Sequence, residues 1–564
     1  MEYSMTGRFT IEDYRYYSRQ PSFKEGKDNG PKLKTREKVN IDLNVELENG
    51  KGCSFVWMHL VEGFKLPSVY IIRLFNKYTS KQVGVMIQIL NEMRLLLKQP
   101  IFKWIEKLME NFKTPILCIQ LGPSTHVIIV TTPELACEFL HKQDEIFMSR
   151  PEILSAELVS DGYLSAILAP FGDQWRKMRK VLHEHLLSSQ SHRWLEPKRN
   201  EEANHLLSYI CNQIAKQENV VDGGLINIRI VSRHFCANVM TKIVFGTRLF
   251  GDGMEAGGSA EEEGAHLTAL FTILKYLYAF CITDYFPWLR GKIDIDGHEK
   301  KTRKALEIIR KYQDPLIDER IRMWKKGART ETSDLLDALI THENPKLTPN
   351  EIKSQIVELM IATIDNPSNA VEWAMAEMIN QPVLLERAVK ELDCVVGRNR
   401  LVEERDLPQL NYLKACIKEC FRLHPFAPLN PPHVPIKDTT VAGYLIPKGS
   451  HVMLSRRGLG RNPDVWEDPL RFDPERHLTW EESRVVLSDD DLTMISFSTG
   501  KRGCPGVVLG STITTMLLAR MVQGFSWGLL CKVDLAEGND DPCLAKPLVA
   551  VAKPRLPNHL YPED

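Results

Sequence analysis

The segment Phe497–Gly506, FSTGKRGCPG, holds a lone cysteine, Cys504, among glycines and positive charges. No second cysteine and no histidine stands close by. A thiolate needs positive charge or backbone N–H groups to stabilise it, and Lys501 and Arg502 precede this one. The apolar, helical pattern that follows places Cys504 just before a helix N-terminus, whose dipole favours a negative sulfur. The segment therefore suits a metal-bound thiolate.

A haem iron can be held by one cysteine thiolate. The glycines of the segment let the backbone approach a flat ligand closely. The full pattern, FxxGxRxCxG, consists of Phe497, Gly500, Arg502, Cys504 and Gly506. It resembles the haem-binding loop of the cytochrome P450 family. The resemblance implies that Cys504 is the axial ligand of a haem b iron, that Arg502 pairs with a haem propionate and that Phe497 packs beside the sulfur. The alternative is a buried, structural cysteine.

Two further motifs of that family lie upstream of the cysteine. In KECFRLHP, Glu419 and Arg422 are three residues apart, so on a helix they share a face and can pair. Taken alone, such a pair is more often a solvated surface pair. The segment DPERHL resembles the family's PERF region and would add Arg476 to the network. His477 stands where the family usually has phenylalanine.

The segment FGDQWRKMR matches the family's WxxxR motif with Trp175 and Arg179. The two residues are four apart on a predicted helix, so an indole N–H and a guanidinium can reach one propionate. The alternative is an amphipathic surface helix in which Trp175 is a core residue. His433, in NPPHV, stands where many family members place another basic residue that binds a propionate.

The composition excludes several other classes of protein. The 564 residues are 43% hydrophobic and 26% charged with a net charge of −1, which is globular and lacks the basic excess of a nucleic-acid binder. The twelve cysteines form no CxxC pair and no zinc spacing, as in a reduced, cytosol-facing protein. No run of 18 apolar residues predicts a transmembrane helix, and the polar start is unlike a signal peptide.

Residues 1–98 read as an atypical, partly disordered N-terminal segment, and residues 99–564 as one large domain. ILCIQLGPSTHVIIV predicts two strands around a turn, with a helix capped at Thr132 behind them. Helical patterns dominate to about residue 424 and short strands follow, so we expect a mainly α fold with a small β-sheet portion. The resemblance specifies the cytochrome P450 fold and a place on the cytosolic face of the endoplasmic reticulum membrane. Plant microsomal members begin with a membrane helix and a proline-rich hinge, which these 98 residues lack; an altered gene model is the alternative.

LTPNEIKSQIVELMIATIDNPSNAVEWAMAEMIN predicts a long helix with a capping box at Thr348 and Glu351. Within it, Pro367 has no N–H for the carbonyl of Thr363, so we expect the helix to kink or open there. Asn366 offers a donor and an acceptor where most family members have a threonine hydroxyl. A kink without any chemical role remains the alternative.

This helix keeps the family's acidic residue as Asp365 and replaces its threonine by Asn366. Together with NPPHV, PERHL and SFSTGKRGC, it closely resembles the plant amino-acid N-monooxygenases. The resemblance implies that an L-amino acid is N-hydroxylated twice and loses water and carbon dioxide to give an aldoxime for plant secondary metabolism, such as cyanogenic glucosides or glucosinolates. Asp365 and Asn366 would relay protons, and electrons would come from NADPH through cytochrome P450 reductase.

The residues after the ExxR motif line the substrate pocket in this resemblance: Phe426, Leu429, Asn430 and Pro431. Asn430 would bind a polar group of the substrate or only cap a turn. Which amino acid fits stays open. Two other functions also stay open: a carbon-hydroxylating P450 of plant secondary metabolism, and an inactive haem-binding product of an altered gene.

Overall fold

The computed structural model describes strands at 5–10, 40–46 and 57–61, and then residues 101–217, 223–250, 260–478, 484–538 and 542–562. The chain divides into two compact units. The smaller comprises Met1–Lys98 with Gly443–Leu445, and the larger comprises Gln99–Ala442 with Ile446–Asp564.

The smaller unit contains one antiparallel sheet of three strands that the sequence analysis did not identify. The strands are β1 (Met5–Thr10), β2 (Asn40–Glu46) and β3 (Trp57–Val61), in the order β1-β2-β3. The partial disorder predicted for residues 1–98 falls on positions outside the described residues.

The larger unit is mainly helical, as predicted. Its helices are α3 (Ile101–Phe112), α4 (Pro133–Cys137), α5 (Leu154–Val159), α6 (Asp173–Leu182), α7 (Ser189–Trp194), α8 (Glu196–Ala215), α9 (Ile228–Phe245), α10 (Ala260–Tyr276), α11 (Ile282–Tyr285), α12 (His298–Lys325), α13 (Leu335–Thr341), α14 (Pro349–Asn380), α15 (Pro382–Val395), α16 (Asn411–Leu423), α17 (Arg456–Gly460) and α18 (Val507–Gly524).

Three small sheets accompany these helices. One contains β4 (Ile116–Leu121), β5 (Thr125–Val130) and β9 (His451–Leu454), with β4 antiparallel and β9 parallel to β5. A second has the order β10-β11-β6, from Phe525–Gly528, Val549–Pro554 and Gly224–Asn227. The third pairs β7 (Thr439–Val441) with β8 (Tyr444–Ile446).

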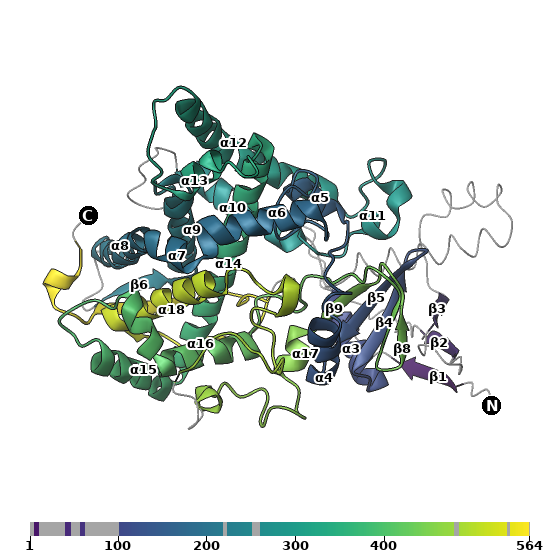
Figure 1. Ribbon diagram of the computed structural model, residues 1–564. Helices are drawn as coiled ribbons and strands as arrows, with labels where there is room; N and C mark the ends of the chain where they lie inside the picture. Colours follow the sequence, from purple (N-terminus) through teal and green to yellow (C-terminus); the bar gives the residue numbers. More distant parts are fainter. Residues whose placement is uncertain are drawn as a thin grey trace, which may run out of the picture. The chain divides into compact units, whose positions relative to one another are not determined.

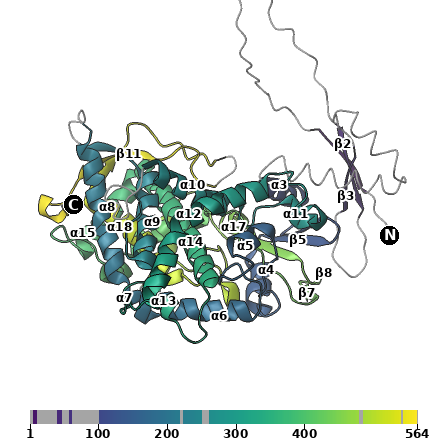
Figure 2. The ribbon, with the colours of Figure 1, turned by 90° about the horizontal axis from the view of Figure 1, so that it is seen from above.

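Helix α14 lies in the middle of the larger unit (Figures 1 and 2). It packs against α9 and α10, and also against α16 and α18. In both views the sheet that contains β5 lies at the opposite end of this unit from α8 and α15. Most of the residues of α14 are buried, because neighbouring helices cover it on several sides. The central helix is therefore the one in which the sequence analysis placed Asp365 and Asn366.

The β4–β5 hairpin and the helix after it lie where the sequence predicted them. Gly122 in the turn has a φ of +65°, and a Cβ there would lie 2.1 Å from the carbonyl oxygen of Tyr285. Only glycine fits such a turn without strain. Thr132 and Pro133 occupy the predicted cap and first positions of α4, although the Thr132 side chain makes no capping hydrogen bond.

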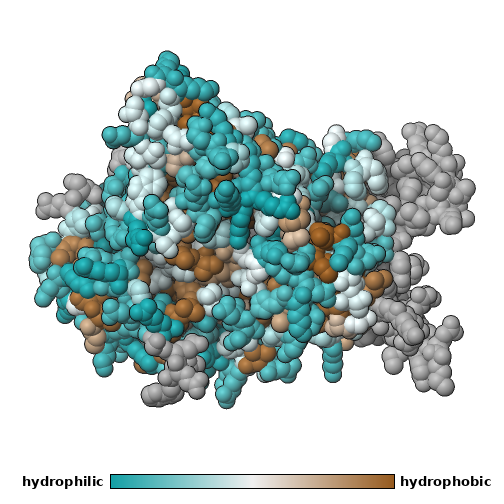
Figure 3. All heavy atoms as spheres, viewed as in Figure 1, coloured by the Kyte–Doolittle hydropathy of each residue, from teal (hydrophilic) through white to brown (hydrophobic). Residues whose placement is uncertain are grey.

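On the face seen in Figure 3, hydrophobic residues form small separate clusters among hydrophilic ones. Within the described residues, α18 is the one helix long and apolar enough to cross a membrane. Most of α18 is buried inside the larger unit, so its apolar composition is explained by its place in the core.

Helix α14 begins with the predicted capping box, since the Thr348 hydroxyl accepts from the N–H of Glu351 and the Glu351 carboxylate accepts from the N–H of Thr348. The expectation was that the helix kinks or opens at Pro367, and the opening is wrong, because the helix is continuous from Pro349 to Asn380. Side chains supply hydrogen bonds on both sides of the proline. Asn366 Nδ2 donates to the carbonyl of Ala362 at 3.3 Å, and Ser368 Oγ donates to that of Asp365 at 3.0 Å.

Candidate active site

The loop before α18 holds Cys504 in a tightly specified backbone conformation. Its amide donates to the carbonyl of Phe497 at 2.8 Å, which closes the loop on itself. Gly500 has a φ of +72°, and a Cβ there would lie 2.6 Å from Asp144 Oδ1 and 2.7 Å from the carbonyl oxygen of Leu140. Glycine at this position thus lets the loop approach the protein's own chain, whereas the sequence analysis had considered approach to a ligand.

Opposing effects act on the sulfur of Cys504. The side chain is exposed, yet burial in the surrounding protein is the largest cause that raises the pKa of its thiol. The N–H of Gly506 and the charges of Arg179 and Arg456 act the other way and lower this pKa. Backbone N–H and two cations therefore favour the thiolate form that a metal ion needs.

Two side chains near the loop carry donor atoms that lack acceptors among the described residues. Arg502 is buried, and its Nε donates to the carbonyl of Met148 at 2.5 Å. Its Nη1 and Nη2 are buried and have no hydrogen-bond partner among the described residues. The guanidinium lies over the ring of Trp175, 4.5 Å from the centroid. The indole Nε1 of Trp175 is likewise buried and lacks a partner in the part of the chain that the structure describes.

Arg179 lies on the same helix as Trp175, one turn further along α6, and donates to the carbonyl of Gly503 at 3.4 and 3.5 Å. His433 is almost fully buried, and its Nδ1 donates to the carbonyl of Phe147 at 3.1 Å. Burial, followed by the charge of Arg150, lowers its pKa well below the usual value. The structure therefore brings WxxxR, His433 and the cysteine loop together.

These residues fit a haem. Buried polar groups are normally hydrogen-bonded, so partnerless donors at Trp175 and Arg502 call for acceptors that the described residues do not supply. Burial, with the charge of Arg150 next, lowers the pKa of Arg502 to about 9. Carboxylates such as haem propionates would satisfy these donors and relieve the repulsion. Negative charge beside His433 would also raise its pKa, so that its partnerless Nε2 could donate as well.

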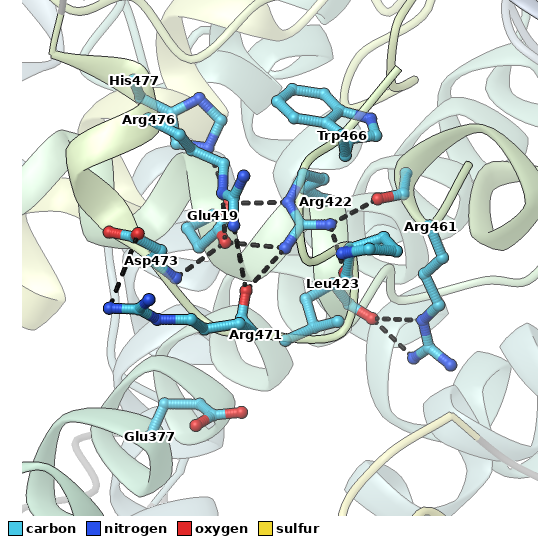
Figure 4. Close-up of polar contacts among 12 residues, drawn as sticks. Glu377, Glu419, Arg422, Leu423, Arg461, Trp466, Arg471, Asp473, Arg476 and His477 are labelled. Carbon is cyan, nitrogen blue, oxygen red and sulfur yellow. Dashed lines mark hydrogen bonds and ion pairs between the residues drawn. The ribbon is translucent and has the colours of Figure 1, made fainter. Parts of the chain in front are cut away.

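The ExxR pair is fully buried and forms the centre of a polar cluster (Figure 4). Arg422 binds the Glu419 carboxylate bidentately, with Nε to Oε2 and Nη2 to Oε1 both at 2.7 Å. Its Nη1 donates to the carbonyls of Gly460 and Pro469. Arg476 donates from Nε to Glu419 Oε1 at 3.0 Å. The structure thus brings Glu419, Arg422 and Arg476 together, and the solvated surface pair is excluded.

His477, the departure from the family pattern, belongs to the same cluster. Its Nε2 lies 2.8 Å from Glu419 Oε2, and its ring meets that of Trp466 edge-on at 5.8 Å (Figure 4). A carboxylate oxygen accepts, so His477 donates here. The sequence analysis noted the substitution without assigning it a contact. Its partner lies 58 residues away in the chain, so no local pattern could have identified it.

Asp365 and Asn366 are half-buried near the middle of α14. The charge of Asp365 acts on α9, where it is the second cause, after burial, that raises the pKa of Cys236. Asn366 uses its Nδ2 within the helix, while its Oδ1 is buried without a hydrogen-bond partner in the described ranges. The side chain therefore offers an acceptor, where threonine would offer a rotating hydroxyl.

The segment assigned to the substrate pocket runs beside the end of β9. Leu429 forms an isolated bridge with Ser455, and Pro431 accepts from Arg150 through its carbonyl at 2.9 Å. Asn430 is buried, and its Oδ1 accepts from the N–H of Leu454 at 2.7 Å. Phe426 is half-buried, and the guanidinium of Arg456 lies over its ring at 4.1 Å.

Two residues that the sequence analysis missed join these segments. Arg150 donates from Nη1 to the carbonyls of Pro431 and Pro432 and from Nη2 to that of Arg502, so it ties His433's segment to the cysteine loop. Glu358 of α14 accepts from the backbone N–H groups of Ala166, Ile167 and Leu168. Neither stands in a short motif, because each acts on segments distant in the sequence.

Comparisons with known proteins agree with this geometry. The sequence model of the family described as cytochrome P450 matches residues 83–550, so the match begins inside the segment 1–98 that the sequence analysis set apart. The chain is 51% identical over 507 residues to isoleucine N-monooxygenase 1 of Lotus japonicus, which covers 88% of this chain and 94% of that protein. It is 50% identical over 475 residues to tyrosine N-monooxygenase of Sorghum bicolor, covering 83% and 84%. Among solved structures, a zebra fish cytochrome P450 with progesterone matches with a TM-score of 0.64 at 22% identity, over 81% of this chain and all of that one.

Proposed function

The chain belongs to the cytochrome P450 family, and we propose that it is a haem-thiolate monooxygenase that hydroxylates the amino group of an L-amino acid twice and so yields the aldoxime. The observation that carries the proposal is the 51% identity with an isoleucine N-monooxygenase across 88% of the chain. The family match at residues 83–550 includes the central helix as well as the haem-binding loop.

The residues that would hold the haem are Cys504 at the iron and Arg502, Trp175, Arg179 and His433 at the propionates. A haem bound through a cysteine thiolate supplies the activation of dioxygen and the transfer of one oxygen atom to a substrate. The protein supplies orientation. Burial raises the pKa of the Cys504 thiol overall, while two cations and the Gly506 N–H would stabilise the thiolate once it is formed, and the buried donors would fix the position of the carboxylates.

Asn366 supports hydroxylation at nitrogen. Its Oδ1 is a buried acceptor with no partner within the described residues, and an amino group is a donor. An N–H of the substrate bonded to Oδ1 would aim the nitrogen at the reacting centre, whereas an aliphatic carbon offers nothing to this acceptor. Asp365, on the preceding position, would hold or pass protons during the two hydroxylations.

The amino-acid side chain that this protein selects stays open. One similar protein is named for isoleucine and another for tyrosine, so close relatives divide between aliphatic and aromatic substrates. The pocket assigned to the side chain includes Phe426, Leu429 and Pro431, which are apolar and suit either class.

Electrons would come from NADPH through cytochrome P450 reductase, and the product would enter plant secondary metabolism. We place the protein at the cytosolic face of the endoplasmic reticulum membrane. Three large apolar side chains support this location, because Trp288, Ile293 and Ile295 are each more than 40% exposed within one short segment. Arg290 and Lys292 lie among them, and a mixture of tryptophan, aliphatic and basic side chains suits a membrane surface.

The test is to incubate the reconstituted holoenzyme with reductase, NADPH and each of a set of labelled L-amino acids. We expect the aldoxime of at least one of Ile, Val, Tyr, Trp, Phe or Met. Oxidation of other substrates at carbon, with no aldoxime from any amino acid, would favour the carbon-hydroxylating alternative. A reduced carbon monoxide spectrum without the band of thiolate-ligated haem would favour the inactive product of an altered gene.

A further inference from the structure

Arg456 is a buried cation that the haem-binding residues do not account for. It is the first residue of α17, its side chain is 5% exposed, and its Nε and Nη1 have no hydrogen-bond partner among the residues described. Its guanidinium makes no ion pair within the same ranges and lies over Phe426 at 4.1 Å. A buried charge without a counterion is costly, so this one calls for an anionic partner from outside the chain.

The surroundings of Arg456 differ from those of the propionate donors. The charges of Arg150 and Arg502 act on His433, and those of Arg150 and Arg179 act on Arg502. Arg456 is absent from both sets. The one charged group that acts on Arg456 is Cys504, as far as the described residues extend. Arg456 therefore faces the same interior as the sulfur but stands apart from the cluster of cations assigned to the propionates.

A second donor without a partner among the described residues belongs to Asn430, which flanks the same backbone bridge as Arg456. The N–H of Asn430 donates to the carbonyl of Leu454 and that of Arg456 to the carbonyl of Pro428, on either side of the Leu429–Ser455 bridge. Asn430 and Arg456 therefore flank the same bridge, one on each of the two paired segments. Asn430 is 3% exposed, and its Nδ2 has no partner in the described part of the chain.

We propose that Arg456, assisted by Asn430, binds the carboxylate of the amino-acid substrate; this inference rests on the proposed function. An amino acid presents its carboxylate one carbon away from the nitrogen to be hydroxylated, so the cation that holds it must lie near the reacting centre. Arg456 meets that condition through its proximity to Cys504, and Asn366 Oδ1 on α14 remains available for the amine. Specificity for amino acids over simple amines would follow.

The experiment compares binding of each L-amino acid with binding of its primary amide, which keeps the amine and the side chain but removes the negative charge. The probes are L-Ile, L-Val, L-Tyr, L-Trp and L-Phe with their amides, titrated into the haem-loaded enzyme by calorimetry and difference spectroscopy. Because a charge-assisted bond to a buried guanidinium is lost, we expect wild-type to favour the acid by about tenfold or more. In Arg456→Gln the affinity for the acid falls by about that factor, and the affinity for the amide changes by less than about twofold.

Arg457→Gln is the matched control. It lies one position away, and its side chain pairs with Glu537 at 2.7 Å, so its loss leaves the preference for the acid unchanged. Arg456→Lys keeps the positive charge, and we expect it to keep part of the preference for the acid over the amide. Asn430→Asp places a negative charge beside the substrate carboxylate and lowers the affinity for the acid alone. If Arg456→Gln fails to hold haem, this variant tests whether the site binds the carboxylate.

Two results would overturn the inference. If Arg456→Gln weakened binding of the acid and of the amide equally, Arg456 would serve the haem or the fold. If both Arg456→Gln and Asn430→Asp kept the wild-type preference for the acid over the amide, Arg456 would not bind the substrate carboxylate. Failure of the proposed function looks different, because wild-type enzyme would then convert no amino acid to an aldoxime. Conversion by wild-type with an unchanged preference in the variants would overturn only the role of Arg456.

Discussion

The sulfur of Cys504 is held between burial, which raises the pKa of the thiol, and the N–H of Gly506 with two cations, which lower it. Burial prevails and the pKa of the thiol is raised overall, so a bound metal ion would supply the further stabilisation that deprotonates Cys504. Burial also raises the pKa of Cys416, where one cation, Arg387, opposes it, and that of Cys211, where burial is the one cause among the described residues.

Replacing Cys504 should therefore abolish the spectroscopic signature of thiolate ligation. Replacing another cysteine should leave that signature unchanged. In Cys504→Ala we expect the reduced carbon monoxide spectrum to lose the band of thiolate-ligated haem completely. Cys394→Ala, at an exposed cysteine, serves as control and should keep that band. Retention of the band in Cys504→Ala would mean that another residue ligates the iron.

The second prediction at this scale concerns the buried acceptor of α14. In Asn366→Ala the oxygen that we assign to the substrate amine is lost, so we expect the yield of aldoxime per NADPH to fall by about tenfold or more while NADPH consumption continues. Asn366→Asp keeps an acceptor at the same place and should retain more of the coupling. If the alanine variant were as well coupled as wild-type, Asn366 would have no part in the reaction.

Residues in short motifs were predictable from the sequence, because their spacing alone carries the signal. Cys504 stands among glycines and charges, and Glu419 and Arg422 share one helical face. The sequence did not predict a role for three other residues, Arg150, Glu358 and Arg456. An isolated charged residue is identified only by its burial and its partners in the fold. Arg150 binds carbonyls 281 and 282 residues away, which no local pattern reports.

At the scale of elements, α14 illustrates where sequence reasoning fails. A proline inside a helix removes one hydrogen bond and was expected to kink or open it. The helix instead continues, and the side chains of Thr363, Asn366 and Ser368 donate to the carbonyls of Leu359, Ala362 and Asp365. Contacts with α9, α16 and α18 add packing along its length. The sequence predicted both ends of this helix and the capping box, whereas its continuity depends on bonds that periodicity does not encode.

Glu358 joins α14 to the segment that leads into α6. Its carboxylate accepts from three consecutive backbone N–H groups, those of residues Ala166, Ile167 and Leu168, and from Ser165 Oγ at 2.5 Å. Glutamine at this position would turn an –NH2 group towards these donors. We therefore expect Glu358→Gln to destabilise the protein by about 2 kcal/mol or more, as for a buried donor left unsatisfied.

Hydrogen exchange provides the measurement for this variant. Loss of the carboxylate should expose the amides of residues 166–168 to faster exchange and lower the haem content, because α6 carries Trp175 and Arg179. Glu386→Gln, at an exposed carboxylate on α15, should change neither quantity. Unchanged protection at 166–168 in Glu358→Gln would show that other contacts hold the segment.

At the scale of the whole molecule, the buried polar cluster around Glu419 holds distant segments of the chain together. It joins α16 to the chain that runs from Gly460 to His477. Five donors converge on the Glu419 carboxylate: Nε and Nη2 of Arg422, the N–H of Asp473, Nε of Arg476 and Nε2 of His477. At Gly460 a Cβ would lie 2.2 Å from the carbonyl oxygen of Arg422, so this position is restricted to glycine. The mainly α fold, the β4–β5 hairpin and the helix starts were predictable, but the register in which distant segments dock on α16 follows from this buried network.

The same cluster makes stability depend on pH. Hydrogen bonds and charges from Arg422 and His477 outweigh burial and lower the pKa of Glu419 from 4.5 to about 2. A carboxyl whose pKa is depressed in the folded state contributes stability that is fully present above pH 4.5 and is lost as the pH falls towards about 2. The shift corresponds to a contribution on the order of 3 kcal/mol.

Unfolding by urea at a series of pH values, for wild-type and Glu419→Gln, isolates this contribution from that of other carboxyl groups. We expect the stability difference between the two proteins to be largest and constant at neutral pH and to shrink below pH 4.5, because wild-type alone loses the charge on Glu419. Glu386→Gln should give a small difference that does not depend on pH in this way. A difference for Glu419→Gln that stayed constant down to pH 3 would mean that the cluster stabilises the fold through shape and neutral hydrogen bonds, and that the charge of Glu419 is not what ties the C-terminal segments to α16.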